Sequence, residues 1–313
     1  MEEFEVLVVG GGAAGLSAAL VLARARRGTV VVDAGEPRNA PAKHMQGFLS
    51  RDGMPPPEFL AVGRAEVESY GGVIRRGRVT GLRRTERSFE ADLNDGGRLV
   101  ARYVIVATGM RDVLPDIPGV AERWGRDLLH CPYCHGYEVR DLPLAVLGGT
   151  PEAVQHAQLI RQWSDDLLLF PHTDRLTEES RDQLLSRAIG IVDGHVARLV
   201  VADDRLSGLE LEDGRIISRA AAFVRPTFVP TTDLLTGLGC DVDVNGWVIS
   251  DSEGRTSDPG VRVVGNAADA RAQVITAAGA GSAVAIAVNA ALVDDDVRDA
   301  VRDFRRGLHP AKT

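Results

Sequence analysis

The chain has 313 residues, of which 44% are apolar, and a formal net charge of −8. A chain of this length is long enough for about two domains with a sizeable core. The acidic balance argues against nucleic acid as a partner, because the basic surface that binds a phosphate backbone is missing. Three cysteines, two of them in one motif, are too few for a disulfide framework, so a reducing cytoplasm is the expected compartment.

Two uncharged stretches, residues 6–23 and 272–293, approach the length of a membrane span. The first is interrupted by glycines, and it follows Glu2 and Glu3 rather than the basic residues of a signal peptide. The second is built from alanine and glycine with polar side chains among them, which favours a helix packed tightly inside a protein. We therefore expect no membrane partner.

The first elements are a strand, a helix and a strand, predicted at residues 5–9, 16–26 and 29–32. Gly10, Gly12 and Gly15 give the spacing G-x-G-x-x-G directly after the first strand, and Asp33 follows the second strand. In this motif the first glycine allows a tight turn, the second lets the backbone approach a pyrophosphate, and the third lets helix and strand pack closely. The acid can accept from a ribose hydroxyl. The pattern predicts a bound adenine dinucleotide.

Residues 72–106 alternate short apolar and polar runs around an N-D-G-G turn at residues 94–97, as antiparallel hairpins do. They end in an apolar strand that closes on Ala107-Thr108-Gly109. The proline and glycine cluster at residues 115–119 is expected to be a linker.

Two thiols separated by two residues, Cys131 and Cys134, can close a small disulfide ring. Pro132 suits the first position of a helix, which makes Cys131 the predicted cap and places Cys134 in the first turn, where the helix dipole favours a thiolate. A structural zinc site is one alternative, because His130 and His135 flank the pair, but such sites usually take four ligands from two separate loops. A thioredoxin-like domain is another, but its cysteines would lie near the first strand of a small domain. We expect a redox-active pair and no metal site.

The second half repeats the alternation of strands and helices. The predicted elements are a strand and turn at residues 144–150, a helix through residue 163, a strand at 167–170, short strands within 194–224, a strand at 261–265 and a helix from residue 273. Pro226 and Pro230 mark a return linker. Cys240 is expected to be a small buried hydrophobe. The order predicts an α/β fold of two units, one inserted into the other.

These motifs resemble those of the low-molecular-weight thioredoxin reductases and their relatives over essentially the whole chain. They are G-G-G-A-A-G at 10–15, A-T-G at 107–109, C-P-Y-C at 131–134, G-N-A-A-D at 265–269 and Q-V-I-T-A-A-G-A-G at 273–281. The resemblance implies two Rossmann-like three-layer dinucleotide-binding domains. An FAD domain would comprise residues 1–114 and 241–313, and an inserted unit of residues 115–240, similar to an NADPH domain, would carry the cysteines. The resemblance also implies a homodimer formed mainly through the FAD domains.

The same resemblance assigns residues to the flavin site. Asn266 stands where the family typically has aspartate and would hold the ribityl chain of FAD. The helix that starts at Gln273 would direct its positive end at the flavin pyrimidine and stabilise the reduced anion. The residues expected to bind FAD are Gly10, Gly12, Ala14, Gly15, Asp33, Ala107, Thr108, Gly109, Gly265, Asn266, Gln273 and Val274.

The second dinucleotide motif departs from the family pattern G-x-G-x-x-A. The sequence G-G-T-P-E-A at residues 148–153 puts the side chain of Thr150 where the backbone must touch pyrophosphate, and Glu152 adds negative charge at the helix start. The family segment H-R-R-x-x-x-R, whose arginines read the 2′-phosphate of NADPH, falls on Pro171, His172, Thr173 and Thr177, so no arginine stands at these places. The acid that would select NAD is missing too, because Phe170 and Pro171 stand there. Asp174 and Arg175 leave a shifted binding mode open.

His135 is the other departure, because typical thioredoxin reductases have aspartate there as proton donor. A histidine can take or give protons near pH 7. Together with the altered nicotinamide motif, C-x-x-C-H resembles the FAD-dependent dithiol oxidases that close the disulfides of gliotoxin, holomycin and romidepsin with oxygen instead of NADPH. The expected enzyme is therefore an FAD-dependent disulfide oxidoreductase, specifically an oxidase of a small-molecule dithiol.

In the mechanism that this resemblance implies, a substrate thiolate attacks Cys131, Cys134 passes the electrons to FAD and His135 moves the protons, while dioxygen becomes hydrogen peroxide. Three alternatives stay open. The first is an NADPH-dependent thioredoxin reductase, whose partner would be a thioredoxin-like protein. The second is a reductase of the same fold fed by ferredoxin or another electron protein, and the third is a flavoprotein that binds or senses without catalysis.

Overall fold

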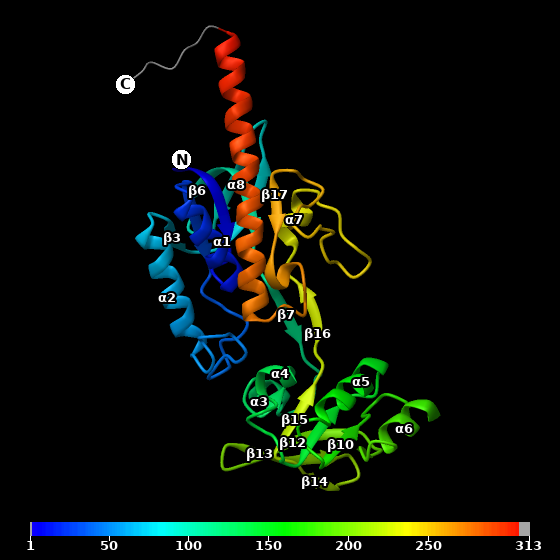
Figure 1. Ribbon diagram of the computed structural model, residues 1–313. Coiled ribbons are helices and arrows are strands. Elements are labelled where there is room, and N and C mark those ends of the chain that lie inside the picture. Colours follow the sequence, from blue (N-terminus) through cyan, green and yellow to red (C-terminus); the bar gives the residue numbers. More distant parts are fainter. Residues whose placement is uncertain (1, 307–313) are drawn as a thin grey trace. The chain divides into compact units, whose positions relative to one another are not determined.

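The computed structural model describes residues 2–306, and within them the chain forms two compact units (Figure 1). Unit 1 comprises Met1–Arg38, Pro57–Arg111 and Pro230–Thr313. Unit 2 comprises Asn39–Pro56 and Asp112–Val229. Each unit has its own sheet with neighbouring parallel strands, so the predicted α/β fold with two Rossmann-like sheets is confirmed.

The sheet of unit 1 has strand order β3-β2-β1-β6-β5-β4, and β17 pairs with β6 on a separate branch. Its strands are β1 (Glu2–Val9), β2 (Thr29–Asp33), β3 (Val73–Arg76), β4 (Val79–Arg84), β5 (Phe89–Leu93), β6 (Arg98–Val106) and β17 (Val261–Val263). The predicted hairpins are confirmed for β4, β5 and β6, which pair antiparallel. They are wrong for β3, which pairs parallel with β2 because it returns after a helix.

Unit 1 has three layers, because successive residues of a strand face opposite sides of the sheet. Val6 and Val8 of β1 pack against helices on one face, and Leu7 and Val9 pack on the other face with β4, β5 and the segment around Leu235. The helices of this unit are α1 (Ala13–Arg24), α2 (Pro56–Ser69), α7 (Asp233–Gly237), the 3-10 helix η1 (Gly265–Ala267) and α8 (Val274–Arg305).

Helix α8 starts where the sequence predicts, with Gln273 as its cap, but it is not enclosed by protein. One face packs tightly on α1, and a Cβ placed at Gly281 would collide with the carbonyl oxygen of Ala14. By length and composition alone, the helix is long and apolar enough to cross a membrane. Only 28% of its most apolar 18-residue stretch is buried. Figure 1 shows its last turns extending past the sheet of unit 1. The expectation of a fully packed helix is therefore wrong, because its opposite face is apolar and exposed.

Unit 2 is also three-layered. A parallel sheet of order β11-β10-β9-β15-β8 has helices on one face and a three-stranded antiparallel sheet on the other. Its strands are β8 (Leu128–Leu129), β9 (Leu144–Leu147), β10 (Leu167–Phe170), β11 (Gly190–Ile191), β12 (Val196–Ala202), β13 (Arg205–Leu211), β14 (Ile216–Ser218) and β15 (Ala221–Val224). Its helices are α3 (Val120–Arg123), α4 (Pro132–His135), α5 (Pro151–Ile160) and α6 (Glu178–Leu185).

The unit boundaries differ from those predicted at residues 114 and 240. The chain changes unit at residues 111 and 229, where the strands β7 (Met110–Val113) and β16 (Thr227–Pro230) pair with each other. The return comes earlier than predicted because Leu235 and Cys240 are buried in the core of unit 1. Residues 39–56 join unit 2, which local sequence patterns do not predict.

Candidate active site

The two motif cysteines lie in unit 2 and form a disulfide, with their Cα atoms 5.2 Å apart. Cys131 caps α4, Pro132 holds its first position, and the Cys134 backbone N–H donates to Cys131 Sγ at 3.2 Å. The predicted cap geometry is confirmed. The helix has only 4 residues, however, so its dipole is small. It stabilises a thiolate less than the sequence prediction assumed.

His135 ends α4 and follows Cys134 directly. Its side chain is half-buried, and burial lowers the pKa of its imidazole below the ordinary 6.5, while the charge of Glu138 opposes this shift. A histidine with a lowered pKa is neutral at pH 7, so its free nitrogen can accept a proton. The structure therefore gives His135 the protonation state of a general base rather than of an acid.

The turn after the cysteines rests on an aromatic side chain. A Cβ at Gly136 would lie 2.8 Å from the ring of Trp163, so only glycine allows this approach. Tyr133 packs edge-on against the same ring, with a centroid distance of 5.8 Å, and remains 63% exposed. The sequence did not indicate Trp163, because it reaches the motif from the turn that follows a different helix, α5. Among residues 2–306 no group of three His, Cys, Asp or Glu side chains is placed to bind a metal.

The first glycine motif in unit 1 has the geometry expected for a nucleotide site. Gly10 has φ of 107°, and a Cβ at Gly15 would collide with the Gly10 carbonyl oxygen, so both positions require glycine. A Cβ at Gly12 would meet nothing within 4 Å, and α1 begins there without a side-chain cap. Asp33 Oδ1 accepts from the backbone N–H of Gly11 at 3.2 Å, which places the carboxylate beside the turn.

Parallel pairing brings the other flavin segments to this turn. Strands β1, β6 and β17 are neighbours and run parallel, so the residues after their carboxyl ends lie at one edge of the sheet. These residues are Gly10, Ala107-Thr108-Gly109 and Gly265. Asn266 shapes the following loop, since its Nδ2 donates to the carbonyls of Asp269 at 2.9 Å and Ala272 at 3.0 Å.

The first turn of α8, like that of α1, has backbone N–H groups that no side chain caps. Gln273 makes no side-chain hydrogen bond to the first turn, and that turn contains no acid. Its backbone N–H groups therefore have the positive character expected next to a flavin ring.

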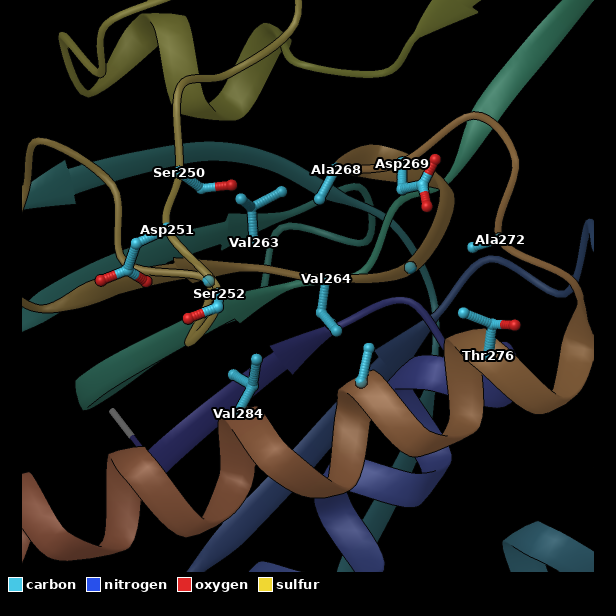
Figure 2. A pocket seen from close by; sticks show the side chains of 13 residues that line it. Ser250, Asp251, Ser252, Val263, Val264, Ala268, Asp269, Ala272, Thr276 and Val284 are labelled. Atoms are coloured by element: carbon cyan, nitrogen blue, oxygen red, sulfur yellow. The ribbon is translucent and has the colours of Figure 1, made fainter.

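A cleft of about 110 Å³ lies beside these flavin segments. Figure 2 shows Thr276 and Val284 of α8 on one side, with Ala268 and Asp269 after η1 and Ser250 of the preceding loop across from them. Gly265 also lines the cleft, whereas Asn266 and Gln273 do not. The cleft therefore adjoins the loop that carries the expected FAD contacts, and of these contacts it includes Gly265.

The corresponding turn in unit 2 is already filled by the protein's own side chains. The Gly149 N–H donates to Asp174 Oδ2 at 2.7 Å, and the Thr150 hydroxyl caps α5 by accepting from the Ala153 N–H at 3.3 Å. Pro151 has no N–H to offer. Hydrogen bonds from its own N–H and from Thr150 lower the pKa of exposed Glu152, which keeps this carboxylate charged. An incoming pyrophosphate would have to displace these groups and meet a negative charge.

The positions where the family reads a 2′-phosphate have structural uses instead. His172 has φ of 59°, and its Nδ1 accepts from the Val196 N–H at 3.0 Å. Thr177 caps α6, where its hydroxyl accepts from the Ser180 N–H at 3.1 Å. Neither side chain carries the fixed positive charge that binds a phosphate.

Comparison with known proteins agrees with this arrangement of one disulfide and two Rossmann-like sheets. The model of the pyridine nucleotide-disulphide oxidoreductase family matches residues 4–281. The chain belongs to the pyridine nucleotide-disulphide oxidoreductase family. Thioredoxin reductase sirT of Leptosphaeria maculans is 31% identical over 306 residues, which cover 91% of this chain and 93% of that protein.

Solved structures give the same result. The crystal structure of HlmI is 55% identical to this chain, with a TM-score of 0.95 and 98% of each chain covered. A putative thioredoxin reductase TrxB from Bacillus anthracis is 32% identical, with a TM-score of 0.89, and the match covers 94% of this chain and 99% of that one. This member of the pyridine nucleotide-disulphide oxidoreductase family is therefore a flavin-dependent enzyme of thioredoxin reductase-like fold that uses FAD, and the expected resemblance is confirmed.

The purified enzyme is expected to be yellow, and replacement of Gly12 by valine should remove most of its FAD while the fold persists. The reason is that a side chain at Gly12 would meet no protein atom within 4 Å but would occupy the space for the pyrophosphate. FAD content per chain and circular dichroism check this. Gly237→Val is the control, because a Cβ at Gly237 also meets nothing within 4 Å. Equal FAD content in both variants would place the pyrophosphate elsewhere.

Proposed function

We propose that this enzyme is a dithiol oxidase, which forms a disulfide in a small-molecule dithiol and passes the electrons through FAD to dioxygen, with hydrogen peroxide as product. The observation that carries the proposal is the nucleotide turn of unit 2, where the Thr150 side chain takes the Ala153 N–H, Pro151 has no N–H to offer, and Glu152 adds a negative charge. The open start of α1 in unit 1 is the contrast, since it has no side-chain cap.

The exchange step needs one disulfide and two substrate thiols. A substrate thiolate attacks Cys131 Sγ, the Cys131–Cys134 bond breaks, and the electron pair leaves with Cys134 as a thiolate. The second substrate thiolate then attacks the substrate sulfur of the mixed disulfide and releases Cys131 as a thiolate. The product is a disulfide, and the enzyme holds a reduced cysteine pair.

His135 supplies proton acceptance in this scheme. Because burial keeps its imidazole neutral at pH 7, it can take the proton of a substrate thiol and so generate the thiolate that attacks Cys131. When bound, FAD supplies the two-electron acceptor that reoxidises the cysteine pair and reacts with dioxygen. The expected FAD residues of unit 1 would hold it, with Asp33 toward the ribose and Asn266 toward the ribityl chain.

NADPH and NADH are expected to reduce the bound flavin very slowly, whereas dithiothreitol should bleach it quickly. The test is anaerobic mixing with each reductant while the visible flavin absorbance is followed. Dithiothreitol serves as the control for a competent flavin and disulfide in the same preparation. Rapid stoichiometric bleaching by NADPH would overturn the oxidase proposal, and hydrogen peroxide released on adding air after dithiothreitol would support it.

The second candidate is an NADPH-dependent thioredoxin reductase, the activity for which two of the relatives are named. Its partner would be a thioredoxin-like protein rather than a small dithiol. The same bleaching experiment separates the two candidates. For either function we propose a cytoplasmic location, since the single disulfide in the described residues is the exchanging one.

We further propose a homodimer formed through unit 1, with α8 in the interface. Six large apolar side chains follow one exposed stripe of this helix, namely Ile275, Ile286, Val293, Val297, Val301 and Phe304. An apolar stripe of this length on a folded unit is typical of a surface that another protein surface covers.

The double variant Ile286→Glu, Val297→Glu is expected to be monomeric, because burying two carboxylates in an apolar contact costs several kcal/mol. Light scattering at micromolar concentration measures the mass of parent and variant. Ile216→Glu in unit 2 is the control, since Ile216 is similarly exposed, at 56% against 62% for Ile286. A parent protein that is monomeric, or a double variant that remains dimeric, would contradict this interface.

A further inference from the structure

We propose that His156 positions the redox disulfide by holding the backbone of His130, the residue directly before Cys131. The inference rests on disulfide exchange at Cys131, which both candidate functions require, and it is independent of the electron acceptor. His156 lies on α5 and is 8% exposed. Its Nε2 lies 2.8 Å from the carbonyl oxygen of His130. Because a carbonyl only accepts, Nε2 must carry the proton and donate.

His130 is held a second time through its own side chain. Its Nδ1 lies 3.2 Å from the carbonyl oxygen of Val224, at the end of β15, so this nitrogen is the donor. Its ring also packs edge-on against Phe228, with a centroid distance of 5.1 Å, and tilted against His156 at 5.4 Å. The short segment between β8 and Cys131 is therefore tied to α5 on one side and to β15 on the other.

The environment of His156 argues for a positioning role rather than for proton transfer. Burial and the neighbouring charges of His130 and Arg225 lower its pKa to about 4, although the hydrogen bond to the His130 carbonyl opposes this shift. The imidazole therefore stays neutral at the pH at which thiols exchange. The donor on Nε2 is then permanent, as a fixed anchor requires.

The other ring nitrogen of His156 shows that a histidine at this position lowers the stability of the fold. Nδ1 of His156 is buried and has no hydrogen-bond partner in the described part of the protein. The neighbouring buried positions of α5 are apolar, namely Ala153, Val154, Ala157 and Ile160. An apolar side chain would avoid the unpaired nitrogen, so the contact with His130 is the feature of this position that an apolar residue cannot reproduce.

Through the His130 backbone, His156 therefore fixes the position of Cys131 Sγ, the sulfur that a substrate attacks. Displacement of a reacting group by about 1 Å can cost on the order of 10²-fold in rate. If the His130 carbonyl is released, the residue before Cys131 loses its anchor on the α5 side, while Cys134 keeps its hydrogen bonds within α4. The position of the outer sulfur and the redox potential of the pair should then both change.

The test compares His156→Leu with His156→Gln in the full-length FAD-loaded enzyme. Leucine removes the donor, whereas the glutamine amide can reach the same carbonyl. Flavin reduction by dithiothreitol should slow on the order of 10-fold to 10²-fold in His156→Leu and recover in His156→Gln. The midpoint potential of the Cys131–Cys134 disulfide should move in the first variant and return toward the parent value in the second. The shape of the pH profile should match the parent in both.

Gln155→Leu is the matched control, since this neighbour on α5 is exposed, whereas His156 is buried. If His156→Leu fails to fold, His156→Asn replaces it, because the shorter amide stays polar without reaching the carbonyl. Parent rate and potential in a folded His156→Leu, or equal loss in His156→Gln, would overturn the proposal. If dithiothreitol reduces no flavin even in the parent, the oxidase proposal fails, and the disulfide potentials alone still decide the role of His156.

Discussion

Replacement of Cys134 by serine is expected to abolish flavin reduction by dithiols, whereas Cys131→Ser should produce a long-wavelength charge-transfer band in the oxidised enzyme. The two sulfurs differ because exchange needs one accessible sulfur and one that is coupled to the flavin. By family resemblance Cys131 is the attacked sulfur and Cys134 the coupled one. With Cys131 removed, Cys134 remains a free thiol whose thiolate can donate charge to the oxidised flavin.

Visible spectra and anaerobic dithiothreitol titrations of the two variants measure this difference. Cys240→Ser is the control, because this third cysteine is buried in unit 1, 6% exposed, and free. Its activity and spectrum should match the parent enzyme. A charge-transfer band in Cys134→Ser but not in Cys131→Ser would reverse the two assignments.

Replacement of His135 by alanine is expected to slow dithiol turnover on the order of 10² to 10⁴-fold, with FAD and the disulfide retained. Such a factor is typical of one positioned acid or base. The sign of the pH dependence follows from the lowered pKa of this histidine. The reactive neutral form is lost as pH falls through the lowered pKa, so the acid limb of the parent profile should lie below pH 6.5 rather than near neutrality.

The measurement is the turnover rate of a model dithiol from about pH 5 to 9 in the parent and in His135→Ala, where the acid limb should vanish. His195→Ala is the control, because His195 is an exposed histidine of the same unit, paired with Glu212. Parent rates in His135→Ala across this range would reduce His135 to a helix-end residue, and another group would then carry the proton.

Features that depend on neighbours in the sequence were determined by the sequence alone. Gly10 and Gly15 specify the first nucleotide turn, Pro132 places Cys131 as the helix cap, and Gln273 caps α8. Each of these follows from local sterics and backbone hydrogen bonding, which depend only on the few residues of the motif. The fold class followed in the same way, because alternating strands and helices leave few arrangements that bury both faces of a parallel sheet.

Features that join distant residues were decided by the tertiary structure. Asp174 accepts from the Gly149 N–H across 25 positions, and His156 reaches the carbonyl of His130 across 26. The sequence showed that the second nucleotide motif was altered, but not that the protein's own carboxylate takes its N–H group. Such contacts depend on how strands pair and how helices pack on them, and no local propensity encodes that pairing. The exposed stripe of α8 has the same origin: composition made this helix apolar, and packing against α1 decided which face remained uncovered.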